Sequence, residues 1–114
     1  MPLLFSYGTL RLPAVQDELF GRAIVEHVDA LTGFHVTIVQ IADARVVRLS
    51  GSANHLMLQA SDQPSDRVEG AVLELTNDEL QIADAYETSQ YRRIAVLTIS
   101  GRQAFVYVAA AGDL

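Results

Sequence analysis

Short apolar segments rich in β-branched residues, separated by turn residues, recur along most of this 114-residue chain. About seven of them have the length and composition of strands, whereas two stretches have helical signals. Most sequential strands are close enough in sequence for antiparallel pairing, which favours an α+β fold and is compatible with a small barrel. The length and the 50% hydrophobic content predict one compact domain over residues 1–114.

The two helical stretches have recognisable start and stop residues. The segment PAVQDELF begins with Pro13, which suits a first helical turn, and Gly21 can end it. The segment TNDELQIADAYE begins with Thr76, and Glu79 three residues later completes a capping box. We therefore predict a short helix from Pro13 and a second helix from Thr76.

Four stretches of the chain allow more specific expectations. The segments YRRIAVLTI and QAFVYVAA flank Ser100 and Gly101, a dipeptide that favours a tight turn, so they predict an antiparallel hairpin. The segment RVEGAVLEL has apolar residues in both alternating positions, which is typical of a strand covered on both faces. Residues 51–66 predict a loop, a short strand and a second loop.

Composition excludes several classes of function. The chain has no cysteine, so it contains no disulfide, zinc knuckle or thiol nucleophile. Its formal charge is −6 and its eight basic residues are all arginines without a cluster, which argues against a nucleic-acid-binding face. No apolar run approaches the length needed to span a bilayer, and the N-terminus lacks the pattern of a signal peptide. We expect a cytoplasmic protein without a membrane partner.

Glu87 is the strongest candidate for a catalytic group. It lies at the C-terminal end of the helix expected from Thr76, where the helix dipole disfavours a carboxylate. Burial beside aromatic and apolar neighbours would raise its pKa further, toward the range of a general acid/base. The alternative is a surface ion pair between Glu87 and Arg92 or Arg93, which is the commoner role of a lone glutamate.

The stretch FSYGTLR, residues 5–11, places Gly8 directly after an expected strand. A glycine there fits a bulge or bend, or a turn whose exposed N–H groups hold an anionic ligand.

Two other kinds of site have weak support. The three histidines, His27, His35 and His55, have no metal-ligand spacing, so no metal site is expected. The segment LSGSA around Ser50 and Ser52 does not have the G-x-S-x-G pattern of a serine hydrolase.

The ordered set of these segments resembles the γ-glutamylcyclotransferase-like family, also called AIG2-like. The family pattern has an N-terminal Y-G-[ST]-L-[RM], a V-x-G before a strand and helix ending at an acidic residue, a Y-x-R and a terminal Y-V. In this chain those elements are residues 7–11, Val68 with Gly70, Glu87, Tyr91 with Arg93, and Tyr107 with Val108.

The resemblance implies a small mixed β-barrel with flanking helices, and a pocket between the N-terminal loop and the acidic residue. It implies that Tyr7, Gly8, Thr9 and Leu10 bind the substrate and that Glu87 is the general acid/base. The implied reaction closes a γ-glutamyl amine or peptide to 5-oxoproline and releases an amine, without metal or organic cofactor. The expected partner is thus a small-molecule γ-glutamyl substrate.

The resemblance also has a departure and an alternative. Many family members have a Tyr-Pro in the middle region, whereas this chain has NHLMLQASDQPSD within residues 51–66. That difference concerns the pocket wall and hence the leaving amine. It motivates a second hypothesis, a non-catalytic small-molecule-binding or interaction module of the same fold. A homodimer is compatible with a small β-rich protein whose strand edges need covering.

Overall fold

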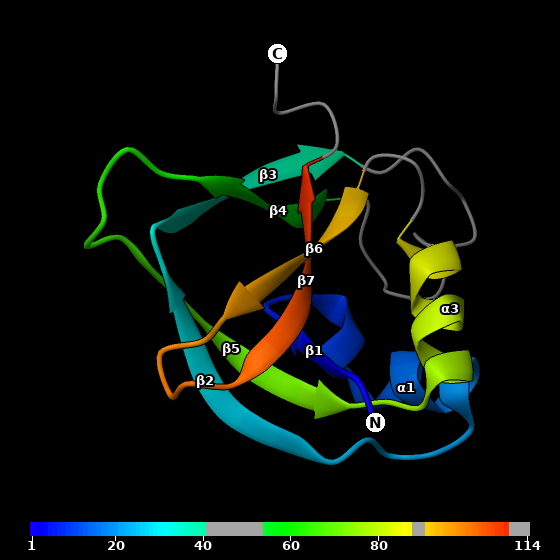
Figure 1. The fold of residues 1–114 in the computed structure, drawn as a ribbon. Helices are drawn as coiled ribbons and strands as arrows, with labels where there is room; N and C mark the ends of the chain where they lie inside the picture. The colour runs from blue at the N-terminus through cyan, green and yellow to red at the C-terminus, as the bar shows by residue number, and fades with distance from the viewer. Residues whose placement is uncertain (41–53, 88–90, 110–114) are drawn as a thin grey trace.

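The computed structural model describes residues 1–40, 54–87 and 91–109. Within them the chain forms seven strands, two α-helices and one 3₁₀-helix (Figure 1). The strands are β1 (Leu3–Ser6), β2 (Glu26–Thr32), β3 (Phe34–Gln40), β4 (Asn54–Ala60), β5 (Arg67–Glu74), β6 (Tyr91–Leu97) and β7 (Gln103–Ala109). The helices are η1 (Thr9–Arg11), α1 (Pro13–Phe20) and α3 (Asn77–Tyr86).

The described strands form a mixed five-stranded sheet in the order β2-β5-β1-β7-β6 and a separate two-stranded sheet, β3-β4. Strand β1 is antiparallel to β5 and parallel to β7, so the central strand is the N-terminal one. The predicted α+β class is confirmed. The expected barrel is not closed, because the edge strands β2 and β6 share no strand ladder among the described residues.

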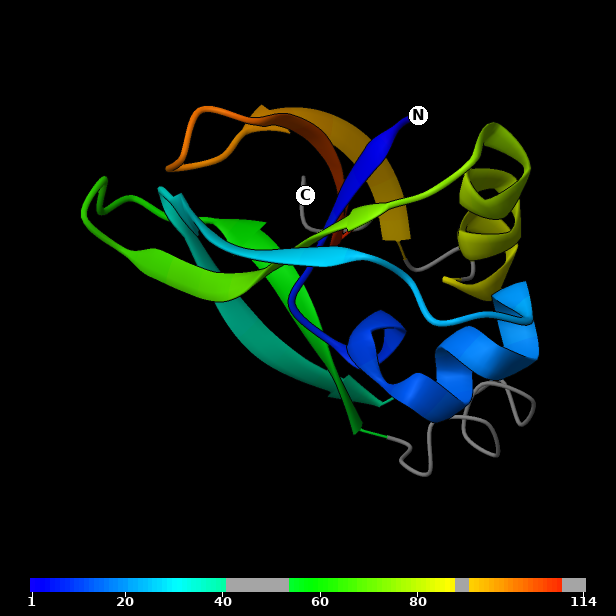
Figure 2. The ribbon, with the colours of Figure 1, turned by 90° about the horizontal axis from the view of Figure 1, so that it is seen from below.

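A bend at Gly33 explains why the sheet stays open. Gly33 has φ of 79°, in the left-handed region that favours glycine, and its N–H donates to the Asp66 carbonyl at 2.8 Å. Strand β2 therefore turns sharply into β3, which pairs with β4 instead of extending the sheet (Figure 2).

Backbone and side-chain hydrogen bonds outside any strand ladder join the two edges of the sheet. The turn between β6 and β7 lies beside β2 (Figure 1), and the Ile99 N–H donates to the Ala30 carbonyl at 2.9 Å. The Asp29 carboxylate accepts from the Ser100 hydroxyl at 2.5 Å and from Arg102 at 3.0 Å. Burial alone would raise the pKa of Asp29, but its hydrogen bonds outweigh burial and hold that pKa well below its usual range.

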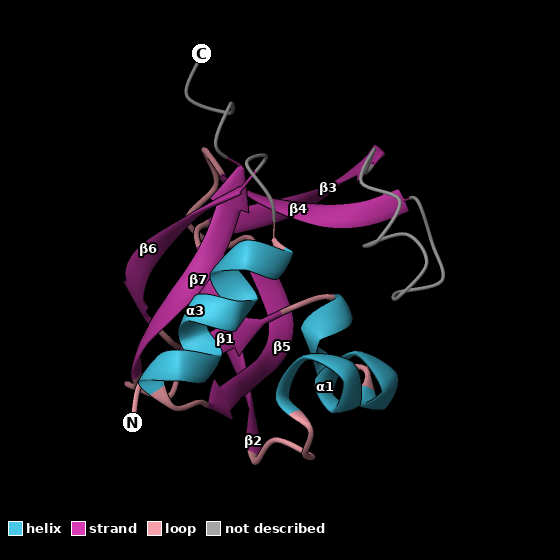
Figure 3. Cartoon of the chain, turned by 90° about the vertical axis from the view of Figure 1, so that its right-hand side faces the viewer, coloured by secondary structure: helices cyan, strands magenta, loops and turns pink. Residues whose placement is uncertain are grey.

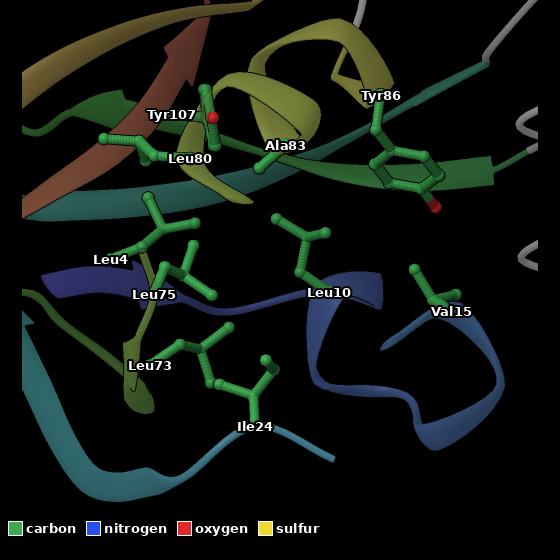
Figure 4. Packing of buried hydrophobic residues seen from close by; sticks show 10 residues of the cluster. All are labelled: Leu4, Leu10, Val15, Ile24, Leu73, Leu75, Leu80, Ala83, Tyr86 and Tyr107. Carbon is green, nitrogen blue, oxygen red and sulfur yellow. The ribbon is translucent and has the colours of Figure 1, made fainter. Parts of the chain in front are cut away.

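The core lies on both faces of the five-stranded sheet. The alternation of side chains along each strand sends Leu4 and Leu73 toward the helices, and Phe5 and Val72 toward β3 and β4. Figure 4 shows the helix-side cluster. The expectation that RVEGAVLEL is covered on both faces is confirmed, since Val72, Leu73 and the following Leu75 are all 0% exposed.

Both helices lie on the same side of the sheet (Figure 3). Helix α1 begins at Pro13 and ends at Gly21 with φ of 67°, as predicted. Helix α3 has the predicted capping box between Thr76 and Glu79. The Glu79 carboxylate also binds the Arg22 guanidinium at 2.7 and 2.8 Å, which ties the chain after α1 to the start of α3.

The remaining local predictions agree with the structure where it describes the chain. Strands β6 and β7 form the antiparallel hairpin, and β4 is the short strand expected within residues 51–66. Residues 51–53 of that stretch lie outside the described residues. No helix in the described part is both long and apolar enough to cross a membrane.

Gly70 permits close packing at the end of β1. A Cβ atom at Gly70 would lie 2.3 Å from the Ser6 carbonyl oxygen and 2.8 Å from Cζ of Phe5. Any side chain there would push β1 away from β5. Glycine at position 70 therefore fixes the point at which the chain leaves β1 and enters the loop that begins with Tyr7.

Candidate functional site

The loop after β1 is a tight turn with exposed donors. Gly8 precedes η1, and the first turn bond runs from the Arg11 N–H to the Gly8 carbonyl at 3.2 Å. The first N–H groups of a helical turn have no partner within the turn. Among the described residues the N–H groups of Thr9 and Leu10 donate to no backbone carbonyl. They are therefore available to an acceptor from outside the turn.

A buried amide from α1 holds this turn in place. The Gln16 side chain donates to the Leu10 carbonyl at 2.9 Å, and its oxygen accepts from the Ile24 N–H at 3.0 Å. Leu10 itself packs in the core beside Val15 (Figure 4). The turn is thus fixed by both polar and apolar contacts.

Gly8 is not required by the protein's own packing. A Cβ atom at Gly8 would meet no atom within 4 Å beyond its two chain neighbours, and its φ of −140° is outside the left-handed region. Gly8 lines a pocket, so its missing side chain leaves the backbone accessible from that pocket. The chain bends at Tyr7 and Gly8 as one expected interpretation of this glycine requires, and the binding of a ligand to the backbone there stays a prediction.

Glu87 faces the same pocket from the end of α3. It caps the helix, with its N–H donating to the Ala83 carbonyl at 3.0 Å, and its side chain is half-buried. Burial raises the pKa of Glu87 from 4.5 to about 8.

The expected alternative role of Glu87 in a surface ion pair is not observed. Arg93 instead binds Asp84 at 3.2 Å and lies over the Phe105 ring at 4.7 Å. No arginine in the described part of the chain pairs with the Glu87 carboxylate.

A small, partly open pocket lies between the Gly8 turn and the end of α3. Its lining residues are Phe5, Ser6, Tyr7, Gly8, Thr9, Leu10, Glu87, Tyr91 and Tyr107. The structure therefore brings together all five residues expected at a site, which come from opposite ends of the sequence.

Tyr7 has a structural use that the sequence did not indicate. Its hydroxyl donates to the Tyr107 carbonyl at 2.7 Å and accepts from the Leu58 N–H at 3.0 Å, which links β7 to β4. Burial, more than the nearby Glu87 charge, raises the pKa of Tyr7 far above its usual value, so this hydroxyl stays neutral. Tyr7 therefore lines the pocket, and its hydroxyl joins strands β4 and β7.

Four of the lining residues are not among the predicted site residues. Tyr91 and Tyr107 were recognised as parts of the Y-x-R and Y-V patterns, whereas Phe5 and Ser6 were interpreted only as strand residues. The Tyr107 hydroxyl donates to Asp84 at 2.6 Å. Burial raises the pKa of both tyrosines far above the usual value, and the Glu87 carboxylate adds to this. The pocket therefore surrounds Glu87 with neutral phenols.

No other candidate residue whose side chain the structure describes lines this pocket. No group of three or more metal-binding side chains gathers within the described ranges. His27 pairs with Glu74 at 2.6 Å and His35 is exposed on β3. Ser50 and Ser52, together with the side chain of His55, lie outside the described part of the protein.

Comparison with solved structures shows the same fold in other proteins. At3g28950.1 from Arabidopsis thaliana is 22% identical with a TM-score of 0.75, covering 99% of this chain and 64% of that one. At5g39720.1 from the same plant is 20% identical with a TM-score of 0.76, covering 97% and 70%. A protein described as gamma-glutamyl cyclotransferase is 18% identical with a TM-score of 0.71, covering 95% and 66%. This chain thus spans about two thirds of their length, 64–70%.

Two further comparisons concern sequence alone. Among curated proteins, none matches this sequence. The sequence pattern of the family described as gamma-glutamyl cyclotransferase, AIG2-like, matches residues 4–113, which include both the Gly8 turn and Glu87. The chain therefore belongs to the gamma-glutamyl cyclotransferase, AIG2-like family.

Proposed function

We propose that this protein closes the γ-glutamyl group of an amine or peptide into 5-oxoproline and releases the amine. The observation that supports this most directly is the position of Glu87, a half-buried carboxyl with a raised pKa, in the same pocket as the Gly8 turn. Membership of the family and likeness to a protein described as gamma-glutamyl cyclotransferase agree with the proposal.

In this proposal the turn binds the oxygen atoms of the substrate. The N–H groups of Thr9 and Leu10 hold the α-carboxylate or the γ-carbonyl oxygen, because they have no backbone acceptor of their own. The open space at Gly8 lets that oxygen approach the backbone. When the γ-carbonyl carbon becomes tetrahedral, fixed N–H donors of this kind stabilise the negative charge on its oxygen.

Glu87 would transfer the proton that the reaction moves. The α-amino nitrogen attacks the γ-carbonyl carbon, a new C–N bond forms, and the attacking nitrogen gives a proton to the Glu87 carboxylate. The bond to the leaving nitrogen then breaks as Glu87 returns the proton to it. With a pKa of about 8, Glu87 lies in the range in which a carboxyl group can both accept a proton and return it.

The proposed reaction is intramolecular. Because both reacting atoms belong to one molecule, holding the substrate in a near-attack conformation supplies a large part of the acceleration.

The test is release of 5-oxoproline from γ-glutamyl dipeptides, γ-glutamylamines and glutathione. We compare the wild type with Glu87→Gln, and with Glu69→Gln as a matched change of an exposed glutamate on β5. Release that is lost only in Glu87→Gln supports the proposal. If the wild type binds a γ-glutamyl compound and converts none of the panel, the chain is instead a binding module of this fold.

A further inference from the structure

One hydrogen bond joins the Gly8 turn to the end of helix α3. The hydroxyls of Thr9, in η1, and Tyr86, the last residue of α3, lie 2.8 Å apart although the residues are separated by 77 positions. Among the hydrogen bonds between described residues, this is the one that joins the turn to α3. Neither residue's sequence context indicates the contact.

The Tyr86 side chain is held firmly enough to position what it binds. Its exposed fraction is 2%, and its ring extends from α3 toward the turn that carries Leu10 and toward Val15 of α1 (Figure 4). Substitution by phenylalanine would keep this ring packing and remove the hydroxyl alone. The effect of the Tyr86 hydroxyl can therefore be measured separately from the packing of its ring.

Tyr86 is also rigidly connected to Glu87. The two residues are adjacent, Glu87 has helix-like φ and ψ of −75° and −7°, and its N–H is bonded to the Ala83 carbonyl. A fixed distance between the Tyr86 hydroxyl and Thr9 therefore limits how far the Gly8 turn can move from the Glu87 backbone.

We infer that Tyr86 is a positioning residue whose hydroxyl, through Thr9, keeps the substrate-binding turn in register with the acid/base Glu87. This inference rests on the proposed function. Ring closure depends on the geometry between the bound carbonyl and the proton acceptor, and a displacement of about 1 Å can lower the rate by about a hundredfold. Tyr86 need not contact the substrate to have this effect.

The experiment compares Tyr86→Phe, Thr9→Val, Thr9→Ser and the double variant Tyr86→Phe/Thr9→Val. We expect Tyr86→Phe to lower kcat by about 10- to 100-fold with little change in KM, in Tm or in the pH dependence of kcat. Thr9→Ser keeps the hydroxyl and should retain most activity. The double variant should lose little more than the worse single variant, since each substitution removes the bond between the two hydroxyls.

Hydrogen exchange of the ligand-free protein supplies a readout that does not require turnover. The amides of Thr9 to Arg11 should exchange faster in Tyr86→Phe and in Thr9→Val, while those of α1 stay protected. Thr37→Val, which removes a weak 3.5 Å bond between β3 and β4, is the matched control and should change neither kcat nor exchange in the turn.

The outcomes separate the inference from the proposed function. Wild-type kcat in Tyr86→Phe, or losses that multiply in the double variant, would overturn the positioning role. If the wild type releases no 5-oxoproline at all, the proposed function fails. Hydrogen exchange of the turn amides then tests the bond between Thr9 and Tyr86 by itself. Faster exchange in both variants would retain the bond as the element that orders the turn, and unchanged exchange would overturn it.

Discussion

Replacing Glu87 by glutamine should make the folded protein more stable at alkaline pH. Burial raises the pKa of Glu87 from 4.5 to about 8, so the folded state binds a proton that the unfolded chain releases between these values. The stabilisation is complete below pH 4.5 and is lost as the pH rises through 8. Glutamine has nearly the same shape and remains neutral throughout, so it avoids this loss.

The magnitude follows from the pKa values. A full change from 4.5 to about 8 corresponds to at most ~5 kcal/mol of unfolding free energy. Because the Glu87 side chain is half-buried, water screens part of this cost, and we expect roughly 2–3 kcal/mol at pH 9. At pH 5 the two proteins should differ by less than about 1 kcal/mol.

Urea unfolding of the wild type and Glu87→Gln at pH 5, 7 and 9 measures this difference. Asp29 and Glu79 do not interfere, because their hydrogen bonds lower their pKa values and affect stability only in more acidic solution. Glu69→Gln, at an exposed site whose carboxylate pairs with Arg67, should change the free energy of unfolding by no more than about 1 kcal/mol at each of the three pH values. A difference for Glu87→Gln that does not change with pH would refute the argument that the pocket desolvates this carboxylate.

Three further substitutions test the parts of the fold that position the site. Gly8→Ala should fold with wild-type stability, because its Cβ meets no protein atom, yet release much less 5-oxoproline in the panel assay. Gly70→Ala places a Cβ 2.3 Å from the Ser6 carbonyl oxygen and should lower the free energy of unfolding in urea by about 3 kcal/mol or more. Asp29→Asn should cost about 2–3 kcal/mol in the same measurement near neutral pH. The wild type should lose that advantage as the pH falls below 3.8, because the pKa of Asp29 is depressed only in the folded state.

Local features of this fold were predictable because their causes lie within a few residues. The Thr76–Glu79 capping box, the Pro13 start and Gly21 end of α1, and the β6–β7 hairpin each depend on neighbouring side chains and backbone. The family pattern added the order of the motifs and so the expectation that Glu87 and the Gly8 loop meet in one pocket.

The arrangement of the strands was harder to predict because distant segments decide it. Sequential antiparallel pairing is correct for β3–β4 and β6–β7, but β2 pairs with β5, and β1 lies between β5 and β7. The expected barrel fails at Gly33, where a left-handed bend redirects β3. Likewise the Tyr7 hydroxyl is engaged by Leu58 and Tyr107, which are 51 and 100 positions away.

Gly8, which follows an expected strand, and Gly70, which lies within one, have different roles that the sequence alone does not distinguish. In the sequence Gly8 and Gly70 have the same set of interpretations, a bulge, a bend or a close approach of another group. At Gly70 the approaching group belongs to the protein, since the Ser6 carbonyl and the Phe5 ring fill the space of a side chain. At Gly8 no protein atom fills that space and the backbone is not left-handed. A glycine that protein packing does not require, in the wall of the pocket that Glu87 also lines, is consistent with the proposed binding of a substrate oxygen to the backbone there.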